Sequence, residues 1–390
     1  MKNYYDKLDS KVKEYYEVLS QEFPEWLNEY INTKELLKQQ YISVTCGKIY
    51  SKMFDYPYNY NSLDHSIAVA LIIWHFTHDK RQTLSGLFHD IATPAFKHCI
   101  DFLNGDYMVQ ESTEDLTTYI IENSSEIMSL LKRDNIKLDE VDNYHIYPIA
   151  DNDTPKLSSD RLEYSLSNAL FIFNLIDIEA VREFYNDIEI QKNEEDINEL
   201  GFKTKKIART FVKLTSTLSI LYRDDRTIYS MQLIADILKR LNEEGKIHKK
   251  DLYELKETDI IKIIEDSKYK TIFDIWKNAK DVQVTKEKPQ TNINSTKFVT
   301  KEAQTIKEKA QDSNQLKDMK NGNINDRNTN DKLSSQNIYY VKQKVKIRYI
   351  DPLFNGKRMS AECKIAKKMI EKNLSYDTQN YSYIEEIKEF

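Results

Sequence analysis

The side chains best suited to chemistry lie between residues 62 and 168, inside apolar stretches. His65 stands in SLDHS, the adjacent pair His89 and Asp90 in LFHDIATPAFKHCID, and Asp160 in LSSDRLEYSLSN. Burying such side chains is unfavourable unless they are paired or bind a metal. Two imidazoles and two carboxylates form a mixed nitrogen and oxygen donor set, which suits Mn, Fe, Ni, Co, Zn or Mg. We therefore predict that these four residues hold a divalent metal ion.

A metal held by four protein ligands keeps coordination positions open for a water and a phosphate oxygen. Such a metal lowers the pKa of the water and offsets charge on a phosphoryl group. The set therefore predicts hydrolysis of a phosphate ester through a metal-bound hydroxide. Taken alone, a buried histidine is more often a hydrogen-bonded core residue, and Asp160 is more often a helix N-terminal residue. The order of the four residues and their apolar setting favour the metal site.

Helices must position these ligands, because apolar residues recur around them with a period near 3.6. His65 shares a helix face with apolar residues three, four and seven positions later, so its imidazole should point into the core. His89 and Asp90 end the second helix, and Asp160 opens the third. The helices predicted from this pattern span Leu63–Thr77, Gln82–Ile91, Ser158–Ile176 and Arg226–Leu241.

Three regions follow one another along the 390 residues. Residues 1–280 are expected to form one all-helical domain, whose chemical core is 60–170. Residues 286–337 are rich in Asn, Lys, Gln, Ser and Thr, which predicts a disordered, flexible linker. Residues 338–390 read as a strand pattern in YYVKQKVKIRY, a turn in DPLFNG and an amphipathic helix in SAECKIAKKMIEKN. We expect this small strand and helix appendage to dock on the helical body or to support a homo-oligomer.

Composition narrows the class of protein. The formal net charge of -6 makes nucleic acid an unexpected partner. The sequence has no run of apolar residues long enough to cross a membrane, and charges interrupt the apolar residues of its first stretch, so we expect neither a membrane span nor a secretory signal. Three cysteines without a CxxC pair fit the reducing cytoplasm. With only 7 glycines, the chain lacks the glycine-rich loops that commonly bind nucleotide phosphates.

The order of these motifs resembles the HD superfamily of metal-dependent phosphohydrolases. Residues 60–168 are similar to the branch that contains the SAM-and-HD and dGTPase-type deoxynucleoside triphosphate triphosphohydrolases. The matching positions are Leu63, His65, Ser66, His89, Asp90, Pro94, Phe96, His98, Asp101, Asp160 and Tyr164. The resemblance implies an all-α HD-domain bundle in which His65, His89, Asp90 and Asp160 ligate the metal. It also implies that Tyr164 packs near a sugar or base, and that His98 and Asp101 face the phosphate or support the ligands.

Three departures from the family pattern affect how phosphate would be handled. Ser62 replaces an arginine, Thr93 replaces a histidine, and Gln110-Glu111 replaces a His-Glu pair. The arginine would bind phosphate through two hydrogen bonds, and the histidine would be a candidate general acid.

Replacements for these groups can be named from the same stretch and from the tail. Glu111 or His98 is a candidate for proton transfer, and Lys97, Arg161 or a tail residue such as Arg348 for phosphate contact. His145, fifteen residues before Asp160, is a further candidate for the mouth of the site.

Two functions remain open from the sequence. The chain is either a metal-dependent hydrolase of a phosphate ester, with a nucleotide or deoxynucleotide as the expected substrate, or a catalytically decayed HD domain. In the second case it would act as a nucleotide-sensing regulatory or scaffold protein. The four-ligand set favours the enzyme, while the departures at Ser62, Thr93 and Gln110 favour the decayed domain.

Overall fold

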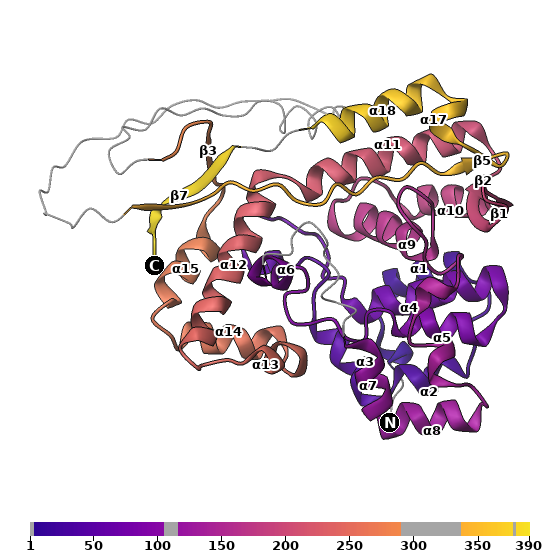
Figure 1. The fold of residues 1–390 in the computed structure, drawn as a ribbon, viewed down its shortest axis with the longest axis horizontal. Coiled ribbons are helices and arrows are strands. Elements are labelled where there is room, and N and C mark those ends of the chain that lie inside the picture. The colour runs from indigo at the N-terminus through magenta and orange to yellow at the C-terminus, as the bar shows by residue number, and fades with distance from the viewer. Residues whose placement is uncertain (1–3, 105–115, 290–336, 377–379) are drawn as a thin grey trace, which may run out of the picture.

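The computed structural model describes residues 4–104, 116–289, 337–376 and 380–390, and these are mostly helical (Figure 1). The helices up to the middle of the chain are α1 Ser10–Leu19, α2 Leu27–Ile31, α3 Lys34–Lys38, α4 Ser62–Thr77, α5 Lys80–Phe88, α6 Cys99–Asn104, α7 Thr117–Asn123, α8 Ser125–Arg133, α9 Ser159–Ser167 and α10 Ile178–Asn186. The later ones are α11 Lys205–Tyr222, α12 Asp225–Glu243, α13 Lys249–Glu254, α14 Glu257–Glu265, α15 Lys270–Asn278, α17 Met359–Glu362 and α18 Lys364–Ser375. Within the described residues, no helix is both long and apolar enough to cross a lipid bilayer.

The four helices predicted from the sequence are confirmed as α4, α5, α9 and α12. The third ends earlier than predicted, because the chain passes into a π-helical turn at Asn168–Ile172. Single π-helical turns are rare inside helices and often accompany functional sites.

Two small sheets show that the all-α prediction was incomplete. One sheet has the order β1-β2-β5-β6, and the other β3-β7-β4. Their strands are β1 Ile188–Lys192, β2 Asn198–Phe202, β3 Gln283–Thr285, β4 Ile338–Val341, β5 Leu353–Phe354, β6 Lys357–Arg358 and β7 Tyr381–Lys388. The β1–β2 hairpin lies inside the region predicted to be helical, and pairs Ile188 with Phe202 and Ile190 with Leu200.

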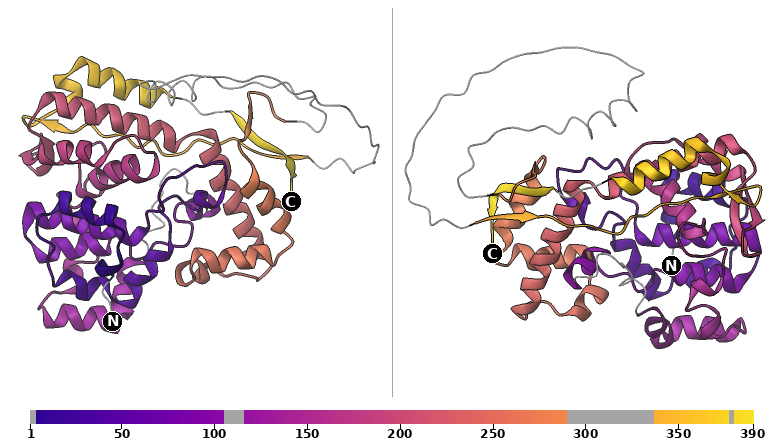
Figure 2. Two further views of the ribbon diagram at one scale, coloured as in Figure 1. Left: turned by 180° about the vertical axis from the view of Figure 1, so that it is seen from behind. Right: turned by 45° about the horizontal axis from the view of Figure 1, so that its top comes forward.

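The C-terminal segment contributes strands to both sheets. β5 pairs in parallel with β2 through Gly201 and Leu353, while β7 lies antiparallel between β3 and β4. Between the sheets, residues 342–352 run as an extended stretch alongside α11 (Figures 1 and 2). α18 packs along α11, so this segment lies on the helical body.

The strand and the helix predicted for the C-terminal segment are present with different bounds, whereas the strand β7 was not predicted. The expected strand pattern over 339–349 forms a strand only as far as Val341. The expected helix over 360–373 is divided at Cys363 into α17 and α18. The predicted linker, residues 286–337, lies almost entirely outside the described residues.

The buried apolar residues form two large clusters. The first joins α1 to α5, α9 to α11 and the tail residues around Ile350, Met359 and Ile370. The second joins α6, α12, α14 and α15 with β4 and β7. The predicted metal ligands belong to helices of the first cluster, whereas the turn after Asp90 reaches the second through Phe96.

Candidate metal centre

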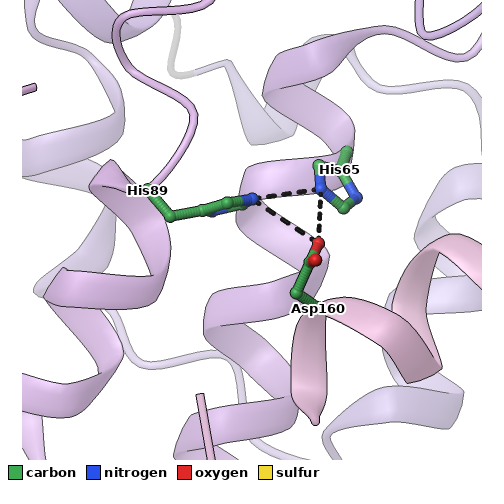
Figure 3. A group of neighbouring side chains, drawn as sticks. All are labelled: His65, His89 and Asp160. Atoms are coloured by element: carbon green, nitrogen blue, oxygen red, sulfur yellow. Dashed lines mark hydrogen bonds and ion pairs between the residues drawn. The ribbon is translucent and has the colours of Figure 1, made fainter. Parts of the chain in front are cut away.

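Three of the four predicted ligands meet at one point, although they come from separate helices (Figure 3). His65 lies in the first turns of α4, His89 directly follows α5, and Asp160 lies in the first turn of α9. The two Nε2 atoms are 3.2 Å apart. Asp160 Oδ1 lies 3.1 Å from Nε2 of His65 and 3.7 Å from Nε2 of His89.

Local sequence fixes the two helices that present the histidines. α4 begins at a capping box in which Asn61 accepts from the amide of Asp64, while the Asp64 side chain returns to Asn61. α5 begins where Asp79 accepts two backbone amides. A side chain at Gly86 would collide with Ile73 of α4, so glycine allows α5 to approach α4 closely. This close approach brings His89 to His65.

The outer nitrogens of both imidazoles are already engaged. His65 Nδ1 donates to the carboxylate of Glu163, and His89 Nδ1 donates to the carbonyl of Gly86 at 2.6 Å. In the neutral state each ring therefore presents an unprotonated Nε2 to the other ring and to Asp160. Facing lone pairs and a carboxylate oxygen repel one another unless a positive charge lies among them, either a proton on His65 or a metal ion. The donor set thus fits a divalent metal ion.

Glu163 is a residue of the candidate metal centre that the sequence analysis did not identify. Its side chain is fully buried, and Oε1 accepts from Tyr60 at 2.9 Å and from Tyr15 at 3.3 Å. Ser167 donates to Oε2 at 3.2 Å. A carboxylate in this position fixes the tautomer and orientation of a ligating histidine. The sequence could have revealed Glu163 by one signal: it is a charged residue on the buried face of a predicted helix, one turn after Asp160.

The electrostatic field of the cluster attracts a cation. Burial alone lowers the pKa of His65, but the carboxylates of Glu163 and Asp160 outweigh burial and raise it to about 10. Burial raises the pKa of Asp160, but its hydrogen bond to His65 and the nearby imidazoles bring it down to about 2. A field that favours positive charge on His65 also favours a metal ion at the same point.

Asp90, the fourth predicted ligand, faces the same point from a greater distance. Its Oδ2 lies 3.9 Å from Nε2 of both His65 and His89. The same oxygen accepts from Lys97 Nζ at 2.7 Å, and Lys97 also donates to Ser62 at 3.3 Å. Lys97 is buried here as the partner of Asp90. The roles of Asp90 as a ligand and of Lys97 as a phosphate contact stay predictions.

An unusual backbone conformation places Lys97. Phe96 and Lys97 are consecutive non-glycine residues with φ of 64° and 43°, a conformation that costs free energy and is often found at functional sites. Glu257 at the start of α14 stabilises the turn by accepting from the amide of Phe96 at 3.2 Å. The second hydrophobic cluster therefore helps to position a residue of the metal centre.

Further along this turn, His98 and Asp101 form a hydrogen-bonded pair. His98 Nδ1 donates to the buried Asp101 at 2.9 Å. The tail residue Arg348 reaches His98, with Nη2 at 3.5 Å from its Nε2. Burial lowers the pKa of His98, and Arg348 lowers it further. The guanidinium of Arg348 also lies 6.0 Å from the ring centre of Tyr164, so it joins two predicted site residues.

Arg161 lies beside Asp160 and is largely buried. Its Nη1 donates to Asn152 at 2.8 Å, to Asp151 at 3.1 Å and to Ser158 at 3.3 Å. These contacts hold a fixed positive charge next to the metal cluster, as a phosphate contact would require. Glu111, the other candidate for proton transfer, lies outside the described residues.

Comparison with known proteins shows the fold and leaves the family open. No family model matches the chain, and no curated protein matches it in sequence. A solved protein of Aquifex aeolicus described as hypothetical aligns over 93% of both chains, with a TM-score of 0.54 and 15% identity. A protein named phosphohydrolase from Bacteroides thetaiotaomicron aligns over 93% of this chain and 96% of its own, with a TM-score of 0.55 and 13% identity. The chain therefore shares its fold with a protein named phosphohydrolase.

Proposed function

We propose that this chain is a metal-dependent phosphohydrolase of the HD type that cleaves a nucleotide or a related phosphate ester. The observation that supports it most is the meeting of His65, His89 and Asp160, with both Nδ1 atoms bound elsewhere. The fold shared with a protein named phosphohydrolase agrees with the proposal. A divalent metal supplies a Lewis acid that activates water and offsets phosphoryl charge.

The surrounding side chains suit the binding and orientation of a phosphate ester. Arg161 holds a positive charge beside Asp160, and Arg348 holds another between His98 and Tyr164. Fixed cations of this kind bind phosphate oxygens and stabilise charge that develops during transfer. The partly exposed Tyr164 offers a flat surface for a sugar or base. We expect a small nucleotide rather than nucleic acid as the partner, and a homo-oligomer remains part of the proposal.

A decayed domain that senses a nucleotide without cleaving it is the second candidate. The contact between Lys97 and Asp90 favours a decayed domain. The lysine ammonium compensates the charge of the Asp90 carboxylate, which was expected to bind the metal. The substitutions at Ser62 and Thr93 point the same way. Metal content separates the two candidates, because a decayed site with Lys97 in place would bind no metal.

The experiment measures metal content and phosphate release by the purified chain over nucleoside mono-, di- and triphosphates. We expect a divalent metal near one equivalent and turnover on at least one substrate. Asp160→Ala should remove both, with turnover falling by at least about 10³-fold, since the charge compensation of the metal is lost with it. Asp153→Ala is the matched control, because Asp153 is exposed on the preceding loop. A wild-type chain without metal and without turnover would refute the proposal.

A further inference from the structure

A histidine and a carboxylate outside the predicted ligand set form a pair beside the metal cluster. His145 Nδ1 lies 2.9 Å from Asp151 Oδ2. The Asp151 side chain is 7% exposed, whereas that of His145 is 51% exposed. A histidine anchored through one nitrogen by a buried carboxylate is oriented in a fixed way and is favoured in its protonated form. This arrangement suits a side chain that delivers a proton.

The pair lies next to the ligands. The ring of Tyr144 is 5.1 Å from that of His89 on one side and 4.4 Å from that of His145 on the other. The amide of Asp160 donates to Ala150, the neighbour of Asp151, at 3.3 Å. Arg161 links Asp151 to the same turn of α9. His145 therefore borders the metal cluster on the side of Asp160, whose side chain is the most exposed of the three donors.

Among the residues that the structure describes, other candidates near the cluster are poorly placed to donate a proton. Thr93 occupies the position of the family's histidine. His98 uses Nδ1 on Asp101 and presents Nε2 to the guanidinium of Arg348, which favours an unprotonated Nε2. Lys97 is buried on Asp90. His145 also has a carboxylate partner, but it differs from His98 and Lys97 because its side chain is half exposed, which leaves it accessible from solvent.

We propose that His145 is the general acid of the reaction and that Asp151 is its positioning residue; this rests on the proposed phosphohydrolase function. A water oxygen forms a bond to phosphorus while the bond from phosphorus to the ester oxygen breaks. The electron pair of the broken bond stays on the leaving oxygen, which takes a proton from His145 Nε2. Solvent accepts one proton from the attacking water and returns one to His145. The products are an alcohol and inorganic phosphate, or the corresponding polyphosphate.

A structural role for the same pair predicts different behaviour. The contact between His145 and Asp151 would then only anchor the loop before α9, where Asn143 also caps a short helical turn. Loss of an anchor would slow every substrate alike and would weaken metal binding. Loss of a general acid affects a substrate according to the basicity of its leaving oxygen, because an acidic alcohol leaves without protonation.

The experiment compares two substrates in the metal-loaded, full-length chain. One is p-nitrophenyl phosphate, whose leaving oxygen is weakly basic, and the other is the best nucleoside phosphate cleaved at its nucleoside oxygen, which is strongly basic. His145→Gln should reduce kcat on the nucleoside phosphate by about 10²-fold or more and on the aryl ester by less than about tenfold. Metal content should not change. His248→Gln is the control, because His248 is exposed at the start of α13.

Two further measurements make the outcome decisive. His145→Gly should regain activity on the nucleoside phosphate when imidazole is added, because the half-exposed position admits a small base. Asp151→Asn should show the same preference for the aryl ester. Equal losses on both substrates, loss of metal, or failure of imidazole to restore activity would refute the role of His145 while leaving the proposed function intact. A wild-type chain inactive on both esters would overturn both proposals.

Discussion

The metal cluster and the binding surface beside it are assembled in different ways. The buried Glu163 of α9 binds His65 and the carbonyl of Gly86 binds His89, while Asp160 lies on α9 one turn before Glu163, and these helices all contribute to the first hydrophobic cluster. The surface beside them brings together His98, Tyr164 and Arg348, and Arg348 comes from the tail. This difference suggests that metal binding and substrate binding can be altered separately, and three substitutions test that separation.

The largest effect is expected from Glu163→Gln, which acts on the metal cluster alone. A glutamine cannot supply the negative charge that orients His65 and favours a cation at its Nε2. We expect metal affinity to fall by about 10- to 100-fold and activity at limiting metal to fall with it. Competition with a metal-binding dye measures the affinity. Unchanged affinity would show that Glu163 only packs the core, and Glu183→Gln on α10 serves as an exposed control.

A smaller effect is expected from Arg348→Ala, which acts on the binding surface. Under the proposed function, loss of this fixed cation from the proposed phosphate contact should raise KM by about tenfold, corresponding to about 1.4 kcal/mol. Metal content should stay at the wild-type level. Lys344→Ala is the control, because Lys344 is exposed on the same extended stretch. Loss of metal from Arg348→Ala would mean that the two regions are not separable.

The smallest effect on activity is expected from Glu257→Gln, which tests the support beneath the turn at Phe96. Burial raises the pKa of Glu257 from 4.5 to about 7. Between these values the folded chain holds a proton that the unfolded chain has released, so stability falls as pH rises from about 4.5 to 7. Glutamine does not titrate, and the variant should lose this dependence, which amounts to about 1 to 3 kcal/mol.

Urea unfolding at pH 5 and at pH 7 measures the change. Burial lowers the pKa of the neighbouring Lys38 to about 7. Lys38 therefore makes stability depend on pH mainly above pH 7, and the two measurements do not go beyond that pH. Glu254→Gln, at an exposed position of α13, is the control. If wild type and Glu257→Gln show the same pH dependence, Glu257 is ionised in the fold.

The sequence predicted the metal cluster better than its surroundings for a physical reason. Histidine and aspartate inside period-3.6 apolar runs are detectable in one sequence, because burial of such groups needs a compensating partner. The contact of Arg348 with His98 depends on how the tail crosses the body, which no local pattern encodes. Arg348 was therefore only one of several candidate cations.

Glu163 and the β1–β2 hairpin were missed for related reasons. The first reads as an ordinary helical glutamate until its burial among tyrosines is known. The hairpin has short strands with a charged turn between them, and its alternation is too brief to outweigh the helical signal around it. The bounds of the helices in the tail were inexact because helix ends are weakly encoded in sequence.

The tail that carries Arg348 is also a mechanical link. It adds β5 to a sheet that packs with the first hydrophobic cluster, and β4 and β7 to a sheet that packs with the second. Two cores joined in this way should unfold in one cooperative transition, and each should lose stability when the tail detaches. Partial opening of either sheet would also draw Arg348 away from His98, so under the proposed function activity should be lost before either core melts.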